Sequence, residues 1–256
     1  MKKSYDLLIT SVFVLFLAGV AVASLILPDR SFSALENRNL RPVPELTERR
    51  FTSGRYMTEA EEYVSDQIVL RDTWVALKAL GERLTGKQEN NGIYFAANDT
   101  LIRRIDEPDP ALLAENIETI NAFVSETDAP VLFGLIPSAA DIWRERLPAG
   151  APSADEAYWI KEIAGRMTAP AIDLHDSLQR HSGEDIYYRT DHHWTSLGAF
   201  YGANAIFEAA GMEALNLKDY PPQTVSEGFL GTNYSSACAW WTEPDTIETY
   251  VSEDDK

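Results

Sequence analysis

The stretch YYRTDHHWTSLGAFYGANAIFEAAG, residues 187–211, places two of the chain's four histidines side by side. His192 and His193 follow Asp191 directly, and the apolar pattern that begins at Thr195 predicts a helix. A carboxylate two residues before a histidine, on a turn, can orient the imidazole ring and stabilise its protonated form. The motif therefore suits a general base that serves a nucleophile supplied elsewhere.

A purely structural role is the alternative for the same turn. Thr190 or Asp191 is suited to cap the following helix, and the two histidines are then hydrogen-bonded turn residues. Trp194 is expected to pack the turn against the core. Because a carboxylate and a histidine at this spacing are a weak signal by themselves, both roles stay open at this point.

A metal site is a third interpretation, because carboxylates and imidazoles are common metal ligands. The turn would need a further ligand from Asp173 or His175, which requires the two turns to meet. Adjacent histidines tend to diverge, and no known ligand spacing is present. We therefore expect no metal and no cofactor, and we expect His181, in a polar loop, to be solvent-exposed.

Four segments outside this stretch alternate between helical and strand-like apolar patterns. They are a helix at 111–125, a strand at 131–137, a helix at 155–167 and a strand at 171–178. This alternation predicts an α/β fold in which helices flank a parallel sheet. Ligands of such sheets bind beyond the carboxyl ends of the strands, where Ser138, His175 and the 191–193 turn are expected.

Two further patterns precede these segments. Residues 58–84 have a mostly helical apolar spacing and predict one or two amphipathic helices. Residues 91–104 alternate around the turn pair Asn98-Asp99 and predict a hairpin. The tail after Gly228 shows neither pattern, so we expect a domain that is incomplete at its C-terminus.

The N-terminus carries an uncharged apolar run at residues 7–27. A helix of about 21 residues is about 32 Å long, enough to cross the hydrocarbon core of a bilayer. Lys2 and Lys3 precede the run, so the rest of the chain is expected outside the cytoplasm. We expect a single-pass membrane anchor; the alternative is a signal peptide cleaved near Ala23, which would release a secreted protein.

Composition limits the organisation and the partners. The predicted parts are an anchor or signal segment at 1–28, an extended stalk at 29–56, rich in charge and proline, and one domain at 57–256. The chain has 40 acidic and 22 basic side chains, a formal charge of -18, which argues against a nucleic-acid partner. Its single cysteine, Cys238, excludes an intramolecular disulfide and a thiolate metal cluster.

The sequence from Ile186 to Gly211 resembles the signature of the bacterial DHHW protein family. Other segments resemble that family in the expected order: ENRNL (36–40), SGRY and DQIVLRDTW (53–74), NGIY (91–94), FLGTNYSS (229–236) and PDTIETY (244–250). The DHHW family is similar in turn to the SGNH-hydrolase-like proteins of alginate O-acetylation. The resemblance implies an SGNH-hydrolase-like sheet.

In those relatives an Asp-x-His-Trp turn supplies the acid and the histidine of a Ser-His-Asp triad. By that resemblance, Asp191 orients the ring, His193 is the base and His192 occupies the variable position. The resemblance also implies that the nucleophilic serine comes later, in a segment beyond 244–250 that this sequence does not contain. Asp191 and His193 are therefore the expected catalytic residues, without an identified nucleophile or substrate-binding residue.

Three serines of this chain were considered as nucleophiles. Ser235 and Ser236 lie late in the chain but lack the strand-turn-helix context of a nucleophile elbow, so we expect an ordinary loop. Ser138 follows a predicted strand and precedes the Asp-x-His turn, so we expect it to line a pocket at most. None is named as the nucleophile.

The resemblance implies a membrane-anchored, extracytoplasmic SGNH-like esterase or O-acetyltransferase that acts on a cell-surface glycan. Its expected partners are a cell-surface polysaccharide or an acyl donor protein, and the chain as given could be an inactive copy. The alternative is a non-catalytic surface protein of the same fold that binds glycan or an assembly partner.

Overall fold

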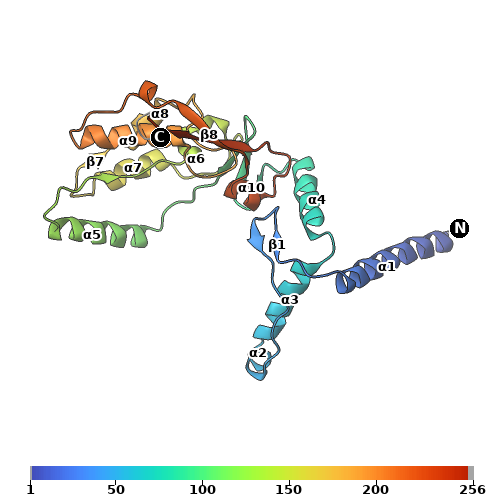
Figure 1. Ribbon diagram of the computed structural model, residues 1–256. Helices are drawn as coiled ribbons and strands as arrows, with labels where there is room; N and C mark the ends of the chain where they lie inside the picture. The colour runs from blue at the N-terminus through green and yellow to red at the C-terminus, as the bar shows by residue number, and fades with distance from the viewer. Residues whose placement is uncertain (1, 253–256) are drawn as a thin grey trace. The chain divides into compact units, whose positions relative to one another are not determined.

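The computed structural model describes residues 2–252, and the chain divides between Thr85 and Gly86 into two compact units (Figure 1). The anchor, stalk and domain boundaries expected from the sequence stay predictions.

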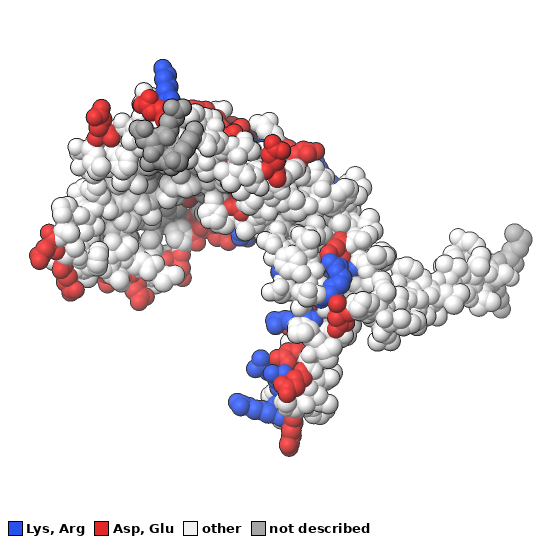
Figure 2. Space-filling model, viewed as in Figure 1, with Lys and Arg blue, Asp and Glu red and all other residues white. Residues whose placement is uncertain are grey.

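The N-terminal unit is mostly helical. It contains helices α1 (Lys2–Ile26), α2 (Glu48–Thr52), α3 (Arg55–Gln67) and α4 (Arg71–Leu84), with an antiparallel strand pair, β1 (Phe32–Ser33) and β2 (Arg38–Asn39). The amphipathic helices predicted at 58–84 are confirmed as α3 and α4. Within α1, the segment Ser4–Ile26 contains an 18-residue window with a mean hydropathy of 2.5 and is long and apolar enough to cross a membrane, as an anchor or a signal sequence. Most of α1 is white, without charged side chains, in Figure 2.

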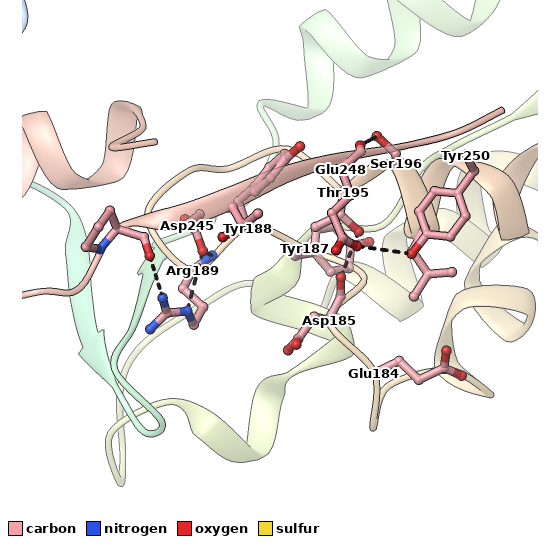
Figure 3. Close-up of a pocket in the computed structure, with 13 residues that line it drawn as sticks. Glu184, Asp185, Tyr187, Tyr188, Arg189, Thr195, Ser196, Asp245, Glu248 and Tyr250 are labelled. Carbon is pink, nitrogen blue, oxygen red and sulfur yellow. Dashed lines mark hydrogen bonds and ion pairs between the residues drawn. The ribbon is translucent and has the colours of Figure 1, made fainter. Parts of the chain in front are cut away.

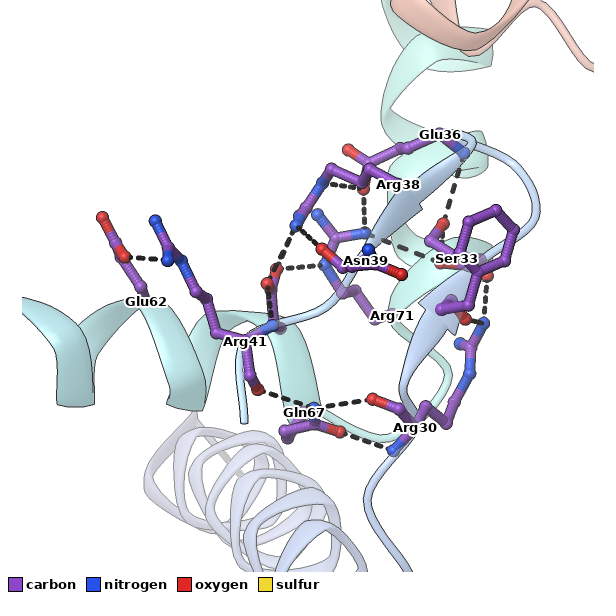
Figure 4. Close-up of polar contacts among 12 residues, drawn as sticks. Arg30, Ser33, Glu36, Arg38, Asn39, Arg41, Glu62, Gln67 and Arg71 are labelled. Carbon is purple, nitrogen blue, oxygen red and sulfur yellow. Dashed lines mark hydrogen bonds and ion pairs between the residues drawn. The ribbon is translucent and has the colours of Figure 1, made fainter. Parts of the chain in front are cut away.

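Ion pairs bind the β1–β2 pair to α3 and α4 (Figure 4). The buried Asp66 carboxylate accepts hydrogen bonds from the Arg38 guanidinium at 2.6 and 2.9 Å and from the Arg41 N–H at 2.9 Å. The hydrogen bonds from Arg38 and from the Arg41 backbone outweigh the effect of burial and lower the pKa of Asp66 to about 2. Arg71 pairs with Glu36 and, at 3.3 Å, with Asp66. The segment that follows α1 is therefore held firmly against α3 and α4.

The C-terminal unit mixes strands and helices. Its strands are β3 (Glu89–Asn90), β4 (Ile93–Ala96) and β5 (Thr100–Arg103) in one antiparallel sheet, the parallel pair β6 (Phe133–Gly134) and β7 (Ala171–Ile172), and the antiparallel ribbon β8 (Pro222–Phe229) and β9 (Asp245–Tyr250). Its α-helices are α5 (Pro110–Glu126), α6 (Ala139–Ile142), α7 (Glu156–Ala164), α8 (Leu174–Gln179), α9 (Ser196–Ala209) and α10 (Thr232–Ala237), with 3-10 turns at Arg144–Arg146 and Leu217–Asp219. This arrangement confirms the α/β fold class.

Local sequence patterns predicted most of these elements. The predicted hairpin is formed by β4 and β5, and its turn contains Asn98 and Asp99, which both have positive φ angles (59° and 53°). The helices predicted at 111–125 and 155–167 are confirmed as α5 and α7. The predicted strands are confirmed as a parallel pair but are shorter than expected, since residues 174–179 form α8 instead.

The C-terminal tail contains two elements that the sequence pattern did not show, and the expected incompleteness of the domain stays a prediction. Residues after Gly228 include α10 and β9, and β9 pairs with β8. The ribbon has register shifts between Thr224 and Ser226 and between Glu227 and Phe229. Such irregularities break the strict alternation by which a strand is predicted, and a single-turn helix is too short to show a period.

The main core of the C-terminal unit contains Trp143, Tyr187 and Ile186, all fully or almost fully buried. The Trp143 and Tyr187 rings meet edge to face at 5.4 Å, and the Tyr187 hydroxyl donates to the Pro137 carbonyl at 2.6 Å. Because Tyr187 also begins the stretch that carries the histidines, this core supports the turn at its base.

Candidate active site

Backbone contacts close the histidine turn at its base. Tyr187 pairs with Trp194 in an antiparallel bridge, and the Thr195 N–H donates to the Ile186 carbonyl at 2.9 Å. Trp194 packs against the core, as predicted, over Gly202, where an added Cβ would lie 2.6 Å from the indole ring. The base of the turn is therefore fixed, and the tip at residues 190–193 carries the polar side chains.

Helix α9 is capped by Thr195, whose hydroxyl accepts from the Gly198 N–H at 3.2 Å. The prediction that Thr190 or Asp191 caps this helix is wrong. The helix is capped by Thr195, the residue directly before its first turn. The side chains of Thr190 and Asp191 are therefore available for partners far along the sequence.

Asp191 and His193 form a close pair of one buried and one exposed side chain. The Asp191 side chain is 5% exposed and the His193 side chain 66%. Asp191 Oδ1 lies 2.5 Å from His193 Nδ1 and accepts from the His193 N–H at 3.0 Å. Asp191 Oδ2 accepts from the N–H and the hydroxyl of Thr232 at 2.7 and 2.9 Å. Both carboxylate oxygens are thus occupied by donors.

These contacts decide which nitrogen of His193 can accept a proton. Burial of Asp191 opposes its ionisation, but hydrogen bonds from Thr232 and His193 outweigh burial and lower its pKa to about 2. Because an ionised carboxylate only accepts hydrogen bonds, Nδ1 of a neutral His193 carries the proton and Nε2 holds the lone pair. A histidine held in this tautomer can remove a proton from a hydroxyl group at Nε2.

His192 is bound differently. Its Nδ1 lies 2.8 Å from the Thr232 hydroxyl and 3.7 Å from Asp191 Oδ1. Burial lowers the pKa of His192; Asp191 opposes this effect, and His193 adds to it. The two histidine rings lie 3.9 Å apart, so the expectation that adjacent histidines diverge is wrong here.

The candidate metal ligands form two separate groups within the described residues. Ligating atoms of Asp191, His192 and His193 lie within 4.8 Å of one another, and a second such group contains Asp173, His175 and Asp176. His175 lies on α8 rather than at the end of a strand, with its Nε2 3.0 Å from Asp141 Oδ2. Within residues 2–252 the two turns do not form one ligand set. Neither Asp173 nor His175 therefore supplies the further ligand that a metal at the 191–193 turn would need.

The tip of the turn is clamped by residues that sequence reasoning did not single out. Asp245, at the start of β9, accepts from the N–H and the hydroxyl of the fully buried Thr190 at 2.8 and 2.6 Å. Asp245 also accepts from the Arg189 N–H at 3.1 Å, and the Tyr234 N–H donates to the Thr190 carbonyl at 3.0 Å. Asp245 and Tyr234 lie in the segments 244–250 and 229–236, which resemble the DHHW family. That resemblance was the one sequence signal that could have pointed to these two residues.

Gly231 allows the close approach of α10 to Asp191. A Cβ added at Gly231 would lie 2.3 Å from Asp191 Cβ and 2.8 Å from its Cα, both impossible contacts. The Gly231 N–H donates to the Thr190 hydroxyl at 3.0 Å. Glycine is therefore required at position 231, because a side chain there would keep Thr232 from approaching Asp191 closely enough to donate to it.

The serines considered from the sequence have structural partners. Ser138 caps α6 and donates to Glu156 at 2.5 Å, and burial raises the pKa of Glu156. Ser235 and Ser236 lie in α10, so the expected loop is wrong, and the Ser235 hydroxyl donates to the Gly231 carbonyl at 3.2 Å. Within residues 2–252, His193 makes no hydrogen bond to a serine.

His181 is only partly exposed, at 31% of its side chain, rather than free in solvent as expected. Its ring stacks on Tyr201 of α9 at 3.5 Å, and Nδ1 lies 2.7 Å from Glu184 Oε1. The aromatic ring of a residue twenty positions on covers the imidazole, a contact that the polar loop sequence alone does not reveal.

A polar cavity of about 480 Å³ lies beside the base of the turn (Figure 3). Its lining includes tyrosines and carboxylates: Tyr187, Tyr188, Asp185, Asp245, Glu248 and Tyr250. Asp191 and His193 are not among the lining residues. The cavity therefore lies near the Asp191–His193 pair but does not contain it.

Several solved structures are similar to about two thirds of this chain. A DHHW family protein from Eubacterium siraeum is 28% identical with a TM-score of 0.55, over 64% of this chain and 56% of that chain. The O-acetyltransferase domain of Pseudomonas putida AlgJ is 20% identical with a TM-score of 0.50, over 64% of this chain and 66% of that domain. Bacillus cereus PatB1 with a sulfonyl adduct is 19% identical with a TM-score of 0.50, over 64% and 56% of the two chains.

The similarity to AlgJ and PatB1 supports the fold alone, and the matched region spans less than two thirds of each of these three relatives. The comparison with curated proteins gave no match. The family described as "SGNH hydrolase-like domain, acetyltransferase AlgX" matches residues 93–253, which is more than half of the sequence. The chain therefore belongs to the family of SGNH hydrolase-like domains of the acetyltransferase AlgX type.

Proposed function

We propose that this chain is part of a membrane-anchored, extracytoplasmic SGNH-like esterase or O-acetyltransferase that acts on a cell-surface glycan. The single observation that carries the proposal is the exposed His193 ring, held at Nδ1 by the buried carboxylate of Asp191. Membership in an acetyltransferase family supports an acyl ester as the substrate. The apolar helix α1 supports the anchor.

In the proposed reaction His193 is the general base and Asp191 positions it. His193 Nε2 accepts the proton of a serine hydroxyl while the serine oxygen forms a bond to the acyl carbonyl carbon. Collapse of the tetrahedral intermediate breaks the ester bond, and His193 returns the proton to the leaving alcohol. Water or a glycan hydroxyl then takes the acyl group, so hydrolysis and transfer share the same acyl-enzyme.

The nucleophilic serine is not among the residues of the described site, and its position is part of the proposal. We propose that it lies in a segment equivalent to the part of the relatives that the matched region does not span. A sulfonyl fluoride forms a stable bond to an activated serine oxygen, which makes it a suitable probe. We expect phenylmethylsulfonyl fluoride to modify one serine outside residues 2–252 in the product of the full reading frame. Peptide mass spectrometry identifies the modified serine. Modification of Ser138, Ser235 or Ser236 would contradict this placement.

A second candidate function is glycan or partner binding without catalysis. It is favoured by the polar cavity beside the turn, in which tyrosine rings and carboxylates provide surfaces that suit a polar ligand (Figure 3). In this case the Asp191–His193 pair would be a remnant without a nucleophile.

Hydrolysis of 4-nitrophenyl acetate by the full gene product separates the two functions. His193→Ala is expected to lower kcat/KM by about 100-fold or more, because removal of a general base costs about two to four orders of magnitude. His192→Ala is the matched control, since His192 binds the Thr232 hydroxyl instead, and it should cost roughly tenfold at most. Unchanged activity in His193→Ala would exclude the proposed base, and equal losses in both variants would favour a metal site.

A further inference from the structure

The connection between α3 and α4 exposes a group of large apolar side chains. Ile68, Leu70, Trp74 and Leu77, here called the α3–α4 corner, are 38%, 62%, 39% and 52% exposed. Leu70 also has a positive φ angle of 59°, which is uncommon for leucine. An exposed leucine in a strained conformation has no stabilising partner in water, so the corner suits an apolar environment.

This corner touches the apolar helix α1 at two places within the same compact unit. The Trp74 ring lies edge to face against the Phe16 ring at 6.1 Å, and the Val69 N–H donates to the Ser24 hydroxyl at 2.9 Å. Whatever medium surrounds the second half of α1 therefore also surrounds the corner.

Helix geometry gives the depth of this contact. Phe16 precedes Ile26, the end of α1, by ten residues, which corresponds to about 15 Å along the axis. The candidate span Ser4–Ile26 is about as long as a hydrocarbon core of about 30 Å. If α1 crosses a bilayer, Phe16 lies well inside the hydrocarbon region, and Trp74 lies against it there.

Three carbonyls of the corner are paired within the chain, which favours contact with lipid. The carbonyl of Ile68 accepts from the Arg71 N–H, and that of Leu70 accepts from the Trp74 N–H, both at 3.1 Å. The Val69 carbonyl accepts from the Trp74 indole N–H at 3.0 Å. A loop in contact with lipid must satisfy its polar groups in this way, because lipid offers no hydrogen bonds.

Polar contacts hold the corner in place beside the end of α1 (Figure 4). Gln67 donates to the carbonyls of Arg30 and Arg41 and accepts from the Arg30 N–H, at 2.9 to 3.0 Å. The Arg30 guanidinium pairs with Asp72 at 2.5 Å. Gln67 directly precedes the corner, and Asp72 lies within it, between Leu70 and Trp74, where its charge is paired with Arg30.

We propose that the α3–α4 corner is embedded in the outer leaflet of the lipid bilayer alongside α1. The partner is therefore a lipid surface, and the corner fixes the N-terminal unit against the membrane in a defined orientation. The inference rests on the anchor of the proposed function, but not on the role of Asp191 or His193.

Spin labels measure the depth of the corner in the full chain reconstituted into phosphatidylcholine vesicles. Leu70→Cys and Leu77→Cys test the corner, and Leu15→Cys, within α1, tests the anchor. Leu112→Cys is the matched control, because Leu112 is a leucine of the C-terminal unit that is 56% exposed. Cys238 is buried, and the wild-type chain carried through the labelling gives its background.

The readout is collision with oxygen, which concentrates in lipid, relative to collision with a water-soluble nickel chelate. We expect the ratios at positions 70 and 77 to approach that at position 15 and to exceed that at position 112 several-fold. A lipid-like ratio at position 15 with water-like ratios at 70 and 77 would overturn the embedded corner alone. Water-like ratios at all three positions would overturn both the anchor and the corner.

Discussion

At the level of single residues, the hydrogen bonds that Asp191 accepts from Thr232 and His193 keep its buried carboxylate ionised. Its ordinary pKa of 3.8 falls to about 2 because hydrogen bonds from Thr232 and His193 outweigh the loss of water. The spacing of Asp191 and His193 predicted a contact between the carboxylate and the imidazole ring, but not which ring nitrogen makes it. It did not predict Thr232, because that donor lies 41 positions along the chain and no local pattern joins the two.

Stability should depend on the charge of Asp191. A carboxyl group whose pKa is lower in the folded state stabilises the fold fully above its ordinary pKa, and this contribution is lost as pH falls through the folded value. We expect the destabilisation caused by Asp191→Asn to be about 2 kcal/mol smaller at pH 2 than at pH 6. Urea unfolding at both pH values measures it, with the exposed Asp219→Asn as control. A difference that does not change with pH would contradict the assigned hydrogen bonds.

Gly231→Ala tests the close packing around the carboxylate. The added methyl group would collide with Asp191, so α10 must shift and the Thr232 hydrogen bonds must lengthen. We expect a loss of about 1–3 kcal/mol of stability, as in other overpacked sites, seen as a lower Tm. Gly183→Ala is the matched control, because nothing lies within 4 Å of a Cβ at that position. Equal melting temperatures for the two variants would show that Gly231 is not in close contact.

At the level of elements, the β8–β9 ribbon and the first turn of α10 position the histidine turn. Local alternation predicted the 91–104 hairpin and the helices α5 and α7, since each of these is made by neighbours in sequence. The ribbon was missed because its bulges interrupt that alternation. Its contact with the turn, between Thr190 and Asp245, spans 55 positions and depends on tertiary structure.

Asp245→Ala should release the turn from the ribbon. The N–H and the hydroxyl of buried Thr190 would lose their acceptor, and each such loss costs about 1–3 kcal/mol. Hydrogen exchange of the Thr190 amide is expected to accelerate strongly in Asp245→Ala and less in Asp245→Asn, which keeps one acceptor oxygen. An unchanged exchange rate in the alanine variant would show that Asp245 does not hold the turn.

At the level of the whole molecule, residues 93–253 form a family domain and α1 is a long apolar helix. Apolar length alone predicted the helix, and the DHHW stretch predicted the family. The two compact units could not be delimited from composition, because the charged segment after α1 is ordered by partly buried ion pairs such as Asp66–Arg38 rather than by an apolar pattern. Ion pairs of this kind look like a solvated charged segment in the sequence.

The central claim is that Asp191 holds His193 as a base with its lone pair on Nε2. Long-range ¹H–¹⁵N NMR of histidine-labelled protein tests it most directly, because this chain has only four histidines and His193→Ala identifies the signal. In its neutral form, His193 should show a proton on Nδ1 and a pyridine-like Nε2. A proton on Nε2, or averaged signals from both tautomers, would contradict the account.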